Sequence, residues 1–173
     1  MLLYKDGRIY LRYLSFILLE GCYINPDPGV IYEYGMGIWL ENEKMTLELC
    51  EDNRCETGDI RVDMEKFIFE DSGSFEQDTP ITEVELGGLK GYEVLYHTTS
   101  KDMYEIWFEL PGDDVGVIVT ECPRAGKGNV KERPGLRDIF DSIRKENIPD
   151  LPSNRSINPL HADGEFNEAK PLF

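Results

Sequence analysis

The chain has few of the side chains that enzymes most often use for acid–base chemistry or metal binding. Among its 173 residues there are 2 histidines and 4 cysteines. A membrane-spanning helix needs about 20 consecutive apolar residues, and the longest apolar run, from Leu14 to Leu19, is far shorter. That run also lacks the charged, then apolar, then small-residue order of a signal peptide. We therefore expect a cytoplasmic protein that does not associate with membranes.

Basic residues are also scarce. The chain has 18 Lys and Arg against 34 Asp and Glu, a net charge of −16 at pH 7. Binding to nucleic acid through its phosphates needs a basic patch, and the pattern of charges predicts none. We expect no nucleic-acid partner. The acidic excess fits solubility, and it also leaves open a basic protein partner or mimicry of nucleic acid.

The cysteines do not form a complete metal-binding motif. They are Cys22, Cys50, Cys55 and Cys122. An even number permits disulfides, but thiols of cytosolic proteins are normally reduced. The spacing of Cys50 and Cys55 falls within the range of half a zinc site, yet structural zinc takes four ligands and no second pair follows. We expect free thiols, no metal and no cofactor.

Residues 82–120 carry the strongest pattern in the chain, an alternation with a period of two. This period is typical of strands that bury one face of an antiparallel sheet. One set of alternate positions is predicted to face the core: Tyr92, Val94, Tyr96, Tyr104, Ile106, Phe108, Leu110, Val115, Val117 and Val119. The other set mixes charged with large apolar groups: Glu93, Leu95, Glu105, Trp107, Glu109 and Ile118. The pattern predicts a scaffold sheet with a candidate binding surface.

The first 50 residues predict further strands. A hairpin with a turn at Lys5-Asp6-Gly7-Arg8 is expected over residues 4–13. A strand over 14–24 follows, and it ends before Pro26 because proline cannot sit inside a hydrogen-bonded ladder. The segments 36–40 and 44–50 form the next pair of strands.

Two segments change to the period of a helix. In the first, Asp59 is placed to cap the N-terminus, and the apolar stripe is Ile60, Met64, Phe67 and Ile68. In the second, Pro134 occupies the first helical position, and the stripe is Leu136, Ile139, Phe140 and Ile143. We expect a single α+β domain over residues 1–147 and an extended, proline-rich tail over 148–173.

The assembled order is several strands, a helix, an antiparallel run and a closing helix. Together with Val84–Tyr92, Tyr104–Phe108 and Ile139–Ile143, this order resembles the Mog/PsbP-like superfamily over about residues 14 to 146. The resemblance implies a three-layer sandwich of helix, antiparallel sheet and helix. Members are mostly non-enzymatic: a Ran-binding protein, extrinsic photosystem subunits, bacterial lipoproteins and secretion-effector chaperones. No functional motif of theirs recurs here, so no functional residue is carried over.

His97 is the one candidate for catalysis, because Thr98, Thr99, Ser100 and Asp102 follow it closely. A nucleophile needs an adjacent base and a group that orients the base. In the alternative interpretation, this segment is only the polar end of a strand that enters a hairpin.

The second face of the sheet is the candidate binding site. Its predicted residues are Trp39, Glu93, Leu95, Glu105, Trp107 and Glu109. Tryptophans on such a surface often anchor interfaces, although a helix or the tail that covered this face would make Leu95, Trp107 and Ile118 core residues. We expect a non-enzymatic cytosolic adaptor that holds a protein partner on this face. Two alternatives stay open: a small hydrolase or metal-dependent enzyme centred on His97, and a structural subunit of a homo-oligomer such as a homodimer.

Overall fold

The computed structural model describes most of the chain between its ends. The described residues are 3–5, 7–17, 22–25, 35–40, 43–50, 56–70, 75–111, 115–124, 130–148 and 160–161. In β1, β4, β5, β6 and β13 the description is of the backbone. None of the described helices is long and apolar enough to cross a membrane.

The described elements follow one another in a fixed order along the chain. They are β1 (Leu3–Lys5), β2 (Arg8–Tyr10), β3 (Leu14–Ile17), β4 (Cys22–Asn25), β5 (Gly35–Leu40), β6 (Glu43–Cys50), α1 (Ile60–Glu65), η1 (Lys66–Glu70), β7 (Glu76–Gln77), β8 (Thr82–Leu86), β9 (Leu89–His97), β10 (Lys101–Glu109), β11 (Val115–Pro123), η3 (Val130–Glu132), α2 (Pro134–Asp141), β12 (Arg144–Lys145) and β13 (Leu160–His161). η1 continues α1 with π-helical winding, and η3 is a short 3₁₀ turn before α2.

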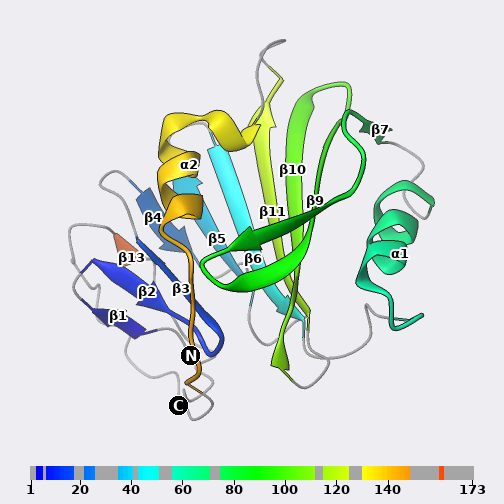
Figure 1. Ribbon diagram of the computed structural model, residues 1–173. Coiled ribbons are helices and arrows are strands. Elements are labelled where there is room, and N and C mark those ends of the chain that lie inside the picture. The colour runs from blue at the N-terminus through cyan, green and yellow to red at the C-terminus, as the bar shows by residue number, and fades with distance from the viewer. Residues whose placement is uncertain are drawn as a thin grey trace, which may run out of the picture.

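A large antiparallel sheet forms the centre of the molecule (Figure 1). Its strand order is β13-β4-β5-β6-β11-β10-β9-β7, and β8 pairs with the other part of β9. A smaller sheet has the order β1-β2-β3-β12. The hairpin predicted over 4–13 is confirmed, since Lys5 pairs with Arg8 across a turn in which Gly7 has a φ of +75°.

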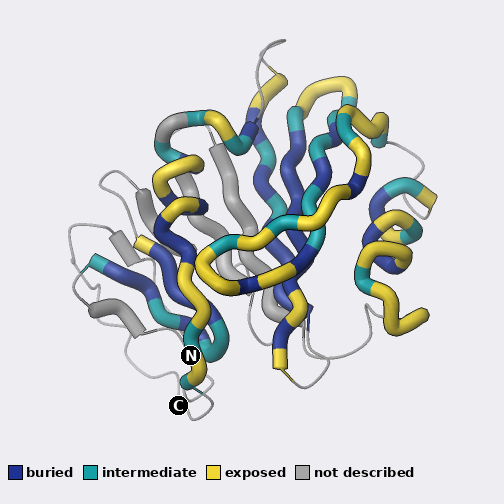
Figure 2. Tube along the Cα trace, viewed as in Figure 1, coloured by how far each residue is buried: buried dark blue, intermediate teal, exposed yellow. Residues whose placement is uncertain are grey.

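Both faces of the large sheet are covered at β9, β10 and β11, and two cores lie there (Figures 1 and 2). On one face α2 and the small sheet bury a cluster that includes Ile106, Phe108 and Phe140. On the other face α1 and η1 bury a cluster that includes Met64, Ile68 and Trp107. The predicted α+β fold, an antiparallel sheet flanked by helices, is therefore confirmed.

The strand pairing corrects the predicted division of side chains between the two faces. Trp107 pairs with Tyr92, and Tyr104 pairs with Leu95. Directly paired residues of antiparallel strands share a face. Alternate residues of β10 thus point to opposite faces, and from Met103 to Phe108 both sets are buried. Tyr104, Ile106 and Phe108 share the α2 face with Glu93, Leu95 and Ile118, and Glu105 and Trp107 share the α1 face with Tyr92, Val94 and Tyr96.

The helix predictions hold with one exception. Oδ1 of Asp59 accepts from the backbone N–H groups of Arg61 and Val62 at 3.0 and 3.2 Å, as expected of an N-cap. The stripe of α2, from Leu136 to Ile143, is buried. Phe67, however, is 45% exposed. It lies in η1, where the wider π-helical winding shifts the phase of the stripe.

Two other segments differ from the sequence predictions or fall outside them. The single strand expected over 14–24 is two strands, because β3 belongs to the small sheet and β4 to the large one. Of the expected tail, 149–159 and 162–173 lie outside the described residues, while Leu160–His161 pairs with Tyr23 and Ile24 of β4.

A buried polar cluster fastens the small sheet to the end of α2. Nη1 of Arg8 donates to the carbonyl oxygen of Ser142 at 2.8 Å and to Oγ of Ser15 at 3.0 Å. The Ser15 hydroxyl donates to Glu146 at 2.6 Å, and the backbone N–H of Ile17 donates to the Ser142 hydroxyl at 2.8 Å. Arg8 is 8% exposed and Ser15 is fully buried. Loss of the guanidinium would leave these acceptors buried without their donor, which is costly.

We expect Arg8→Met to lower the free energy of unfolding by about 2–3 kcal/mol, since the change keeps the apolar stem and removes a charged donor. Urea denaturation measures the effect. Arg137→Met, at an exposed position of α2, is the matched control and should stay within about 0.5 kcal/mol of the wild type. Equal losses in the two variants would contradict the role assigned to Arg8.

Candidate functional site

Two of the predicted binding residues are core residues in the structure. Trp107 is 0% exposed and Glu105 is 2% exposed, on the face that α1 covers. The ring of Phe67 from η1 lies over Trp107, with 5.9 Å between centroids. The alternative interpretation, in which a helix covers this face of the sheet, therefore holds for Trp107 and Glu105. The side chain of Trp39, in β5, lies outside the described residues.

Glu105 has a structural explanation. Its carboxylate accepts from the Trp107 indole N–H at 2.6 Å and from the Tyr96 hydroxyl at 2.7 Å. These donors satisfy oxygens that would otherwise be buried without partners. Burial, and then the nearby Glu105 carboxylate, raises the pKa of Tyr96 above its ordinary value of 10.0. The phenol is thus held as a donor.

Glu93 and Leu95 line a cleft on the α2 face. The cleft has a volume of about 260 Å³ and is lined by Thr79, Pro80, Thr82, Glu93, Val94, Leu95, Tyr104 and Lys131. Nζ of Lys131 lies 3.0 and 3.1 Å from the two carboxylate oxygens of Glu93, and the Tyr104 hydroxyl donates to the same carboxylate. Burial, and then the hydrogen bond to Glu93, raises the pKa of Tyr104. The cleft therefore combines apolar walls with a neutralised charge pair.

One wall of this cleft is fixed to the edge of β9. The backbone N–H groups of Asp78 and Thr79 donate to the carbonyl oxygen of Leu95 at 2.9 and 3.2 Å. The N–H of Leu95 donates in return to the Thr79 hydroxyl at 2.9 Å. Asp78 and Thr79 are thus held against β9 before β8 begins at Thr82, and this positions Thr79, Pro80 and Thr82 around the opening.

Glu109 lines a second concavity, on the α1 face. It has a volume of about 480 Å³ and is lined by Glu83, Val84, Glu85, Lys90, Gly91, Tyr92 and Glu109. Lys90 lies opposite Glu85 in the β8–β9 pair. All four charged residues of this lining are exposed. With three carboxylates and one ammonium, the concavity is acidic.

The strand β8 separates the two concavities. It pairs with β9 along one edge, and no strand among the described residues pairs with its other edge. Thr82, Glu83 and Glu85 are exposed, while Val84 and Leu86 pack against the α2-side core. The Gly87-Gly88 turn anchors the hairpin, since the N–H of Lys145 donates to the Gly87 carbonyl at 2.8 Å. In Figure 2 the β8–β9 hairpin passes in front of buried strands, and β8 alternates between exposed and intermediate residues.

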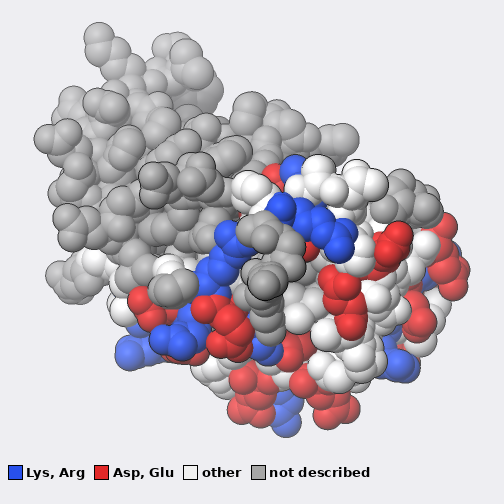
Figure 3. Space-filling model, turned by 90° about the horizontal axis from the view of Figure 1, so that it is seen from above, with Lys and Arg blue, Asp and Glu red and all other residues white. Residues whose placement is uncertain are grey.

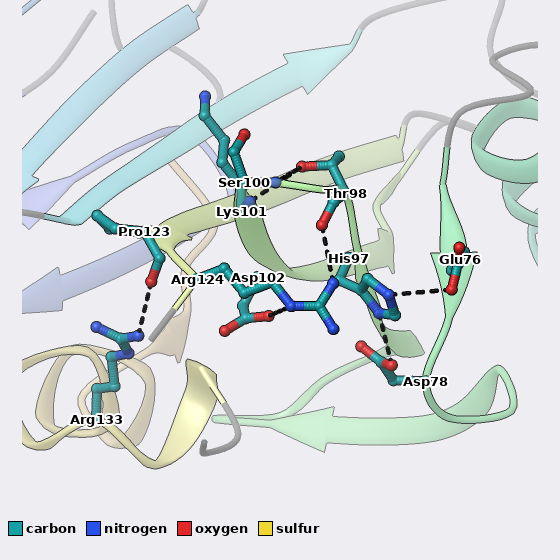
Figure 4. Close-up of polar contacts among 10 residues, drawn as sticks. All are labelled: Glu76, Asp78, His97, Thr98, Ser100, Lys101, Asp102, Pro123, Arg124 and Arg133. Atoms are coloured by element: carbon teal, nitrogen blue, oxygen red, sulfur yellow. Dashed lines mark hydrogen bonds and ion pairs between the residues drawn. The ribbon is translucent and has the colours of Figure 1, made fainter. Parts of the chain in front are cut away.

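His97 is engaged by two carboxylates (Figure 4). Its Nδ1 lies 2.8 Å from Oδ1 of Asp78, and its Nε2 lies 3.2 Å from Oε2 of Glu76. The Thr98 hydroxyl accepts from the N–H groups of Ser100 and Lys101, so it shapes the turn. Among the described contacts His97 therefore has no hydroxyl to activate, and it joins segment 76–78 to β9.

No metal site is present within the described part of the chain, since no group of three or more His, Cys, Asp or Glu is placed to hold an ion. The side chain of Cys122 is buried. Seen from above, a row of basic side chains crosses the described surface, and acidic side chains lie on both sides of it (Figure 3). Ion pairs such as Lys101–Glu121 at 2.9 Å and Lys131–Glu93 at 3.0 Å neutralise bases at this end of the sheet.

Sequence reasoning missed Thr82, Glu83, Glu85 and Lys131. The alternation of Thr82–Leu86 was a visible signal, but whether a strand lies at an edge depends on pairing across the sheet. Lys131 reaches Glu93 across 38 positions of sequence, and nothing local indicates that contact.

No known family model matches the chain, and no curated protein matches it. A crystal structure of a protein from Bacteroides thetaiotaomicron is similar with a TM-score of 0.46 and 9% sequence identity, over 78% of this chain and 45% of that one. This chain thus matches less than half the length of that protein. A likeness at this level identifies neither a family nor a function.

The raised pKa values of Tyr96 and Tyr104 predict a loss of stability in alkali. Below about pH 10 both phenols are protonated in the folded and unfolded chains, so their contribution to the free energy of unfolding is fully present. Above about pH 10 the unfolded chain releases protons that the folded chain keeps. The free energy of unfolding then falls by about 1.4 kcal/mol per pH unit for each tyrosine.

Urea denaturation at a series of pH values from neutral to strongly alkaline measures this slope. Tyr96→Phe and Tyr104→Phe should each reduce it by about 1.4 kcal/mol per pH unit. The slope of the double variant is compared with that of the wild type, so the titration of other groups cancels. If the free energy of unfolding fell with the same slope in the wild type and the double variant above pH 10, these phenols would not resist ionisation.

Proposed function

We propose that the protein is a non-enzymatic cytosolic binding protein that captures an extended segment of a protein partner as an additional strand at β8. The observation that carries this proposal is the outer edge of β8, with which no strand among the described residues pairs, and which lies between one concavity on each face of the sheet. An added strand gains affinity from main-chain hydrogen bonds. Its alternate side chains project toward the two faces, and so toward the two concavities.

The charges beside β8 favour a basic partner. Glu83 and Glu85 are exposed on the α1 face, with Glu109 nearby on β10. Such acidic residues also keep an edge strand from pairing indiscriminately. Lysine or arginine at alternate positions of the incoming strand would lie beside them, and the net charge of −16 would favour its approach.

The same charges disfavour a homodimer paired through β8. If two copies met there antiparallel about Val84, Glu83 of one copy would lie opposite Glu85 of the other. Like charges directly opposite across strands are destabilising. The resemblance to the Mog/PsbP-like superfamily, with its mostly non-enzymatic members, supports the same class of function.

Reversing the charges beside β8 tests the proposal. Random short peptides displayed on phage are selected on the wild type, and the affinities of the selected peptides are then measured by fluorescence polarisation. We expect enrichment of peptides with Lys or Arg at alternate positions. Glu83→Lys/Glu85→Lys should weaken their binding by about tenfold or more, because complementary charge becomes repulsion.

The matched control is Glu65→Lys/Glu70→Lys, which makes the same change of net charge at exposed positions of α1 and η1. It should bind the selected peptides nearly as well as the wild type. Unfolding midpoints verify that both variants are folded. Equal weakening of peptide binding in the two double variants would show that the effect comes from net charge and not from β8. Undiminished binding by the β8 variant would contradict the proposal.

A further inference from the structure

The cleft on the α2 face is too small for most ligands and is well suited to one side chain. Its volume is about 260 Å³, whereas small-molecule sites usually occupy roughly 300–1,000 Å³. Pro80 and Leu95 provide apolar walls, and the Glu93–Lys131 pair provides a polar wall. A pocket of this kind accommodates the anchor residue of a protein partner, the type of contact that dominates many interfaces.

Charge argues for an anchor with a neutral polar tip. The Glu93 carboxylate already receives Lys131 Nζ and the Tyr104 hydroxyl. A charged tip would compete with this pair for its own counter-charge, and desolvating a charge without a partner is costly. A hydroxyl does not need to break the pair, because it can donate to Glu93 or accept from Lys131, whose side chain is 35% exposed.

Position argues for a long side chain. Thr82 points to the α2 face and stands at the rim of the cleft, since it pairs with Glu93. A strand added beyond β8 would lie about 4.8 Å farther out. A short side chain would end above the added strand itself, whereas a long side chain that leans across β8 would reach Thr82 at the rim of the cleft.

We propose that the cleft formed by Glu93, Leu95, Tyr104 and Lys131 receives a tyrosine side chain of the partner strand. This inference rests on the proposed strand addition at β8. It gives the bound segment a pattern: basic residues toward Glu83 and Glu85 on one face, and a tyrosine toward the cleft on the other. Tyrosine is favoured as an anchor because it buries a rigid apolar ring and keeps a polar tip.

Three synthetic peptides provide the probe. Each has lysine at alternate positions and threonine between them, and the central threonine is replaced by tyrosine in one peptide, phenylalanine in a second and alanine in a third. All carry the same charge. Fluorescence polarisation should show that the wild type binds the tyrosine peptide at least about tenfold more tightly than the alanine peptide.

Two variants assign the preference to the cleft. Thr82→Trp fills its rim and should abolish the preference for tyrosine over alanine, whereas the isosteric Thr82→Val should keep it. Lys131→Met should reduce the preference for tyrosine over phenylalanine, which reports the contact to the hydroxyl. Unfolding midpoints confirm that each variant is folded.

The possible outcomes distinguish failure of the tyrosine anchor from failure of strand addition at β8. Equal affinities for the tyrosine and alanine peptides would overturn the anchor and leave strand addition at β8 supported. A tyrosine preference that survives Thr82→Trp would overturn the assignment to this cleft. Failure of the wild type to bind any of the peptides would overturn both proposals.

Discussion

The close approach of β9 and β10 at Gly91 is the constraint on which the rest of the structure depends. A Cβ atom at position 91 would lie 1.9 Å from the carbonyl oxygen of Trp107, so no side chain is tolerated there. Gly91 pairs with Phe108 on one side and with Val84 on the other. It therefore sets the register of both strand pairs, and with it the faces on which Glu93, Trp107 and the residues of β8 lie.

This register explains why an acidic chain can bury carboxylates in its centre. Glu105 on one face and Glu93 on the other each meet a tyrosine hydroxyl from the neighbouring strand. Glu105 adds the Trp107 indole and Glu93 adds Lys131. Phenols whose raised pKa keeps them protonated act as donors to both carboxylates. The exposed carboxylates of Glu83 and Glu85 give β8 its negative charge.

Much of the fold was predictable from local signals. The turn at Gly7, the cap at Asp59, the stripe of α2 and the antiparallel strands predicted within 82–120 each depend on neighbours in sequence, and each is confirmed. The candidate site was less predictable, because alternation shows that a strand has two faces but not how it aligns with its partners. From Met103 to Phe108 both sets of β10 residues are buried, with Glu105 satisfied by two donors, so the choice of Trp107 as a surface residue was wrong. The contact between Glu93 and Lys131 depends on tertiary structure alone.

Amide hydrogen exchange over residues 82–86 tests the central claim most directly. In the free protein the amides of β8 that point away from β9 should exchange rapidly, because no described strand pairs with that edge. With the lysine-tyrosine peptide bound, the same amides should become protected, while those of α1 should not change. Protection of β8 that is already complete in the free protein, or that is unaltered by saturating peptide, would contradict a free edge that accepts a partner strand.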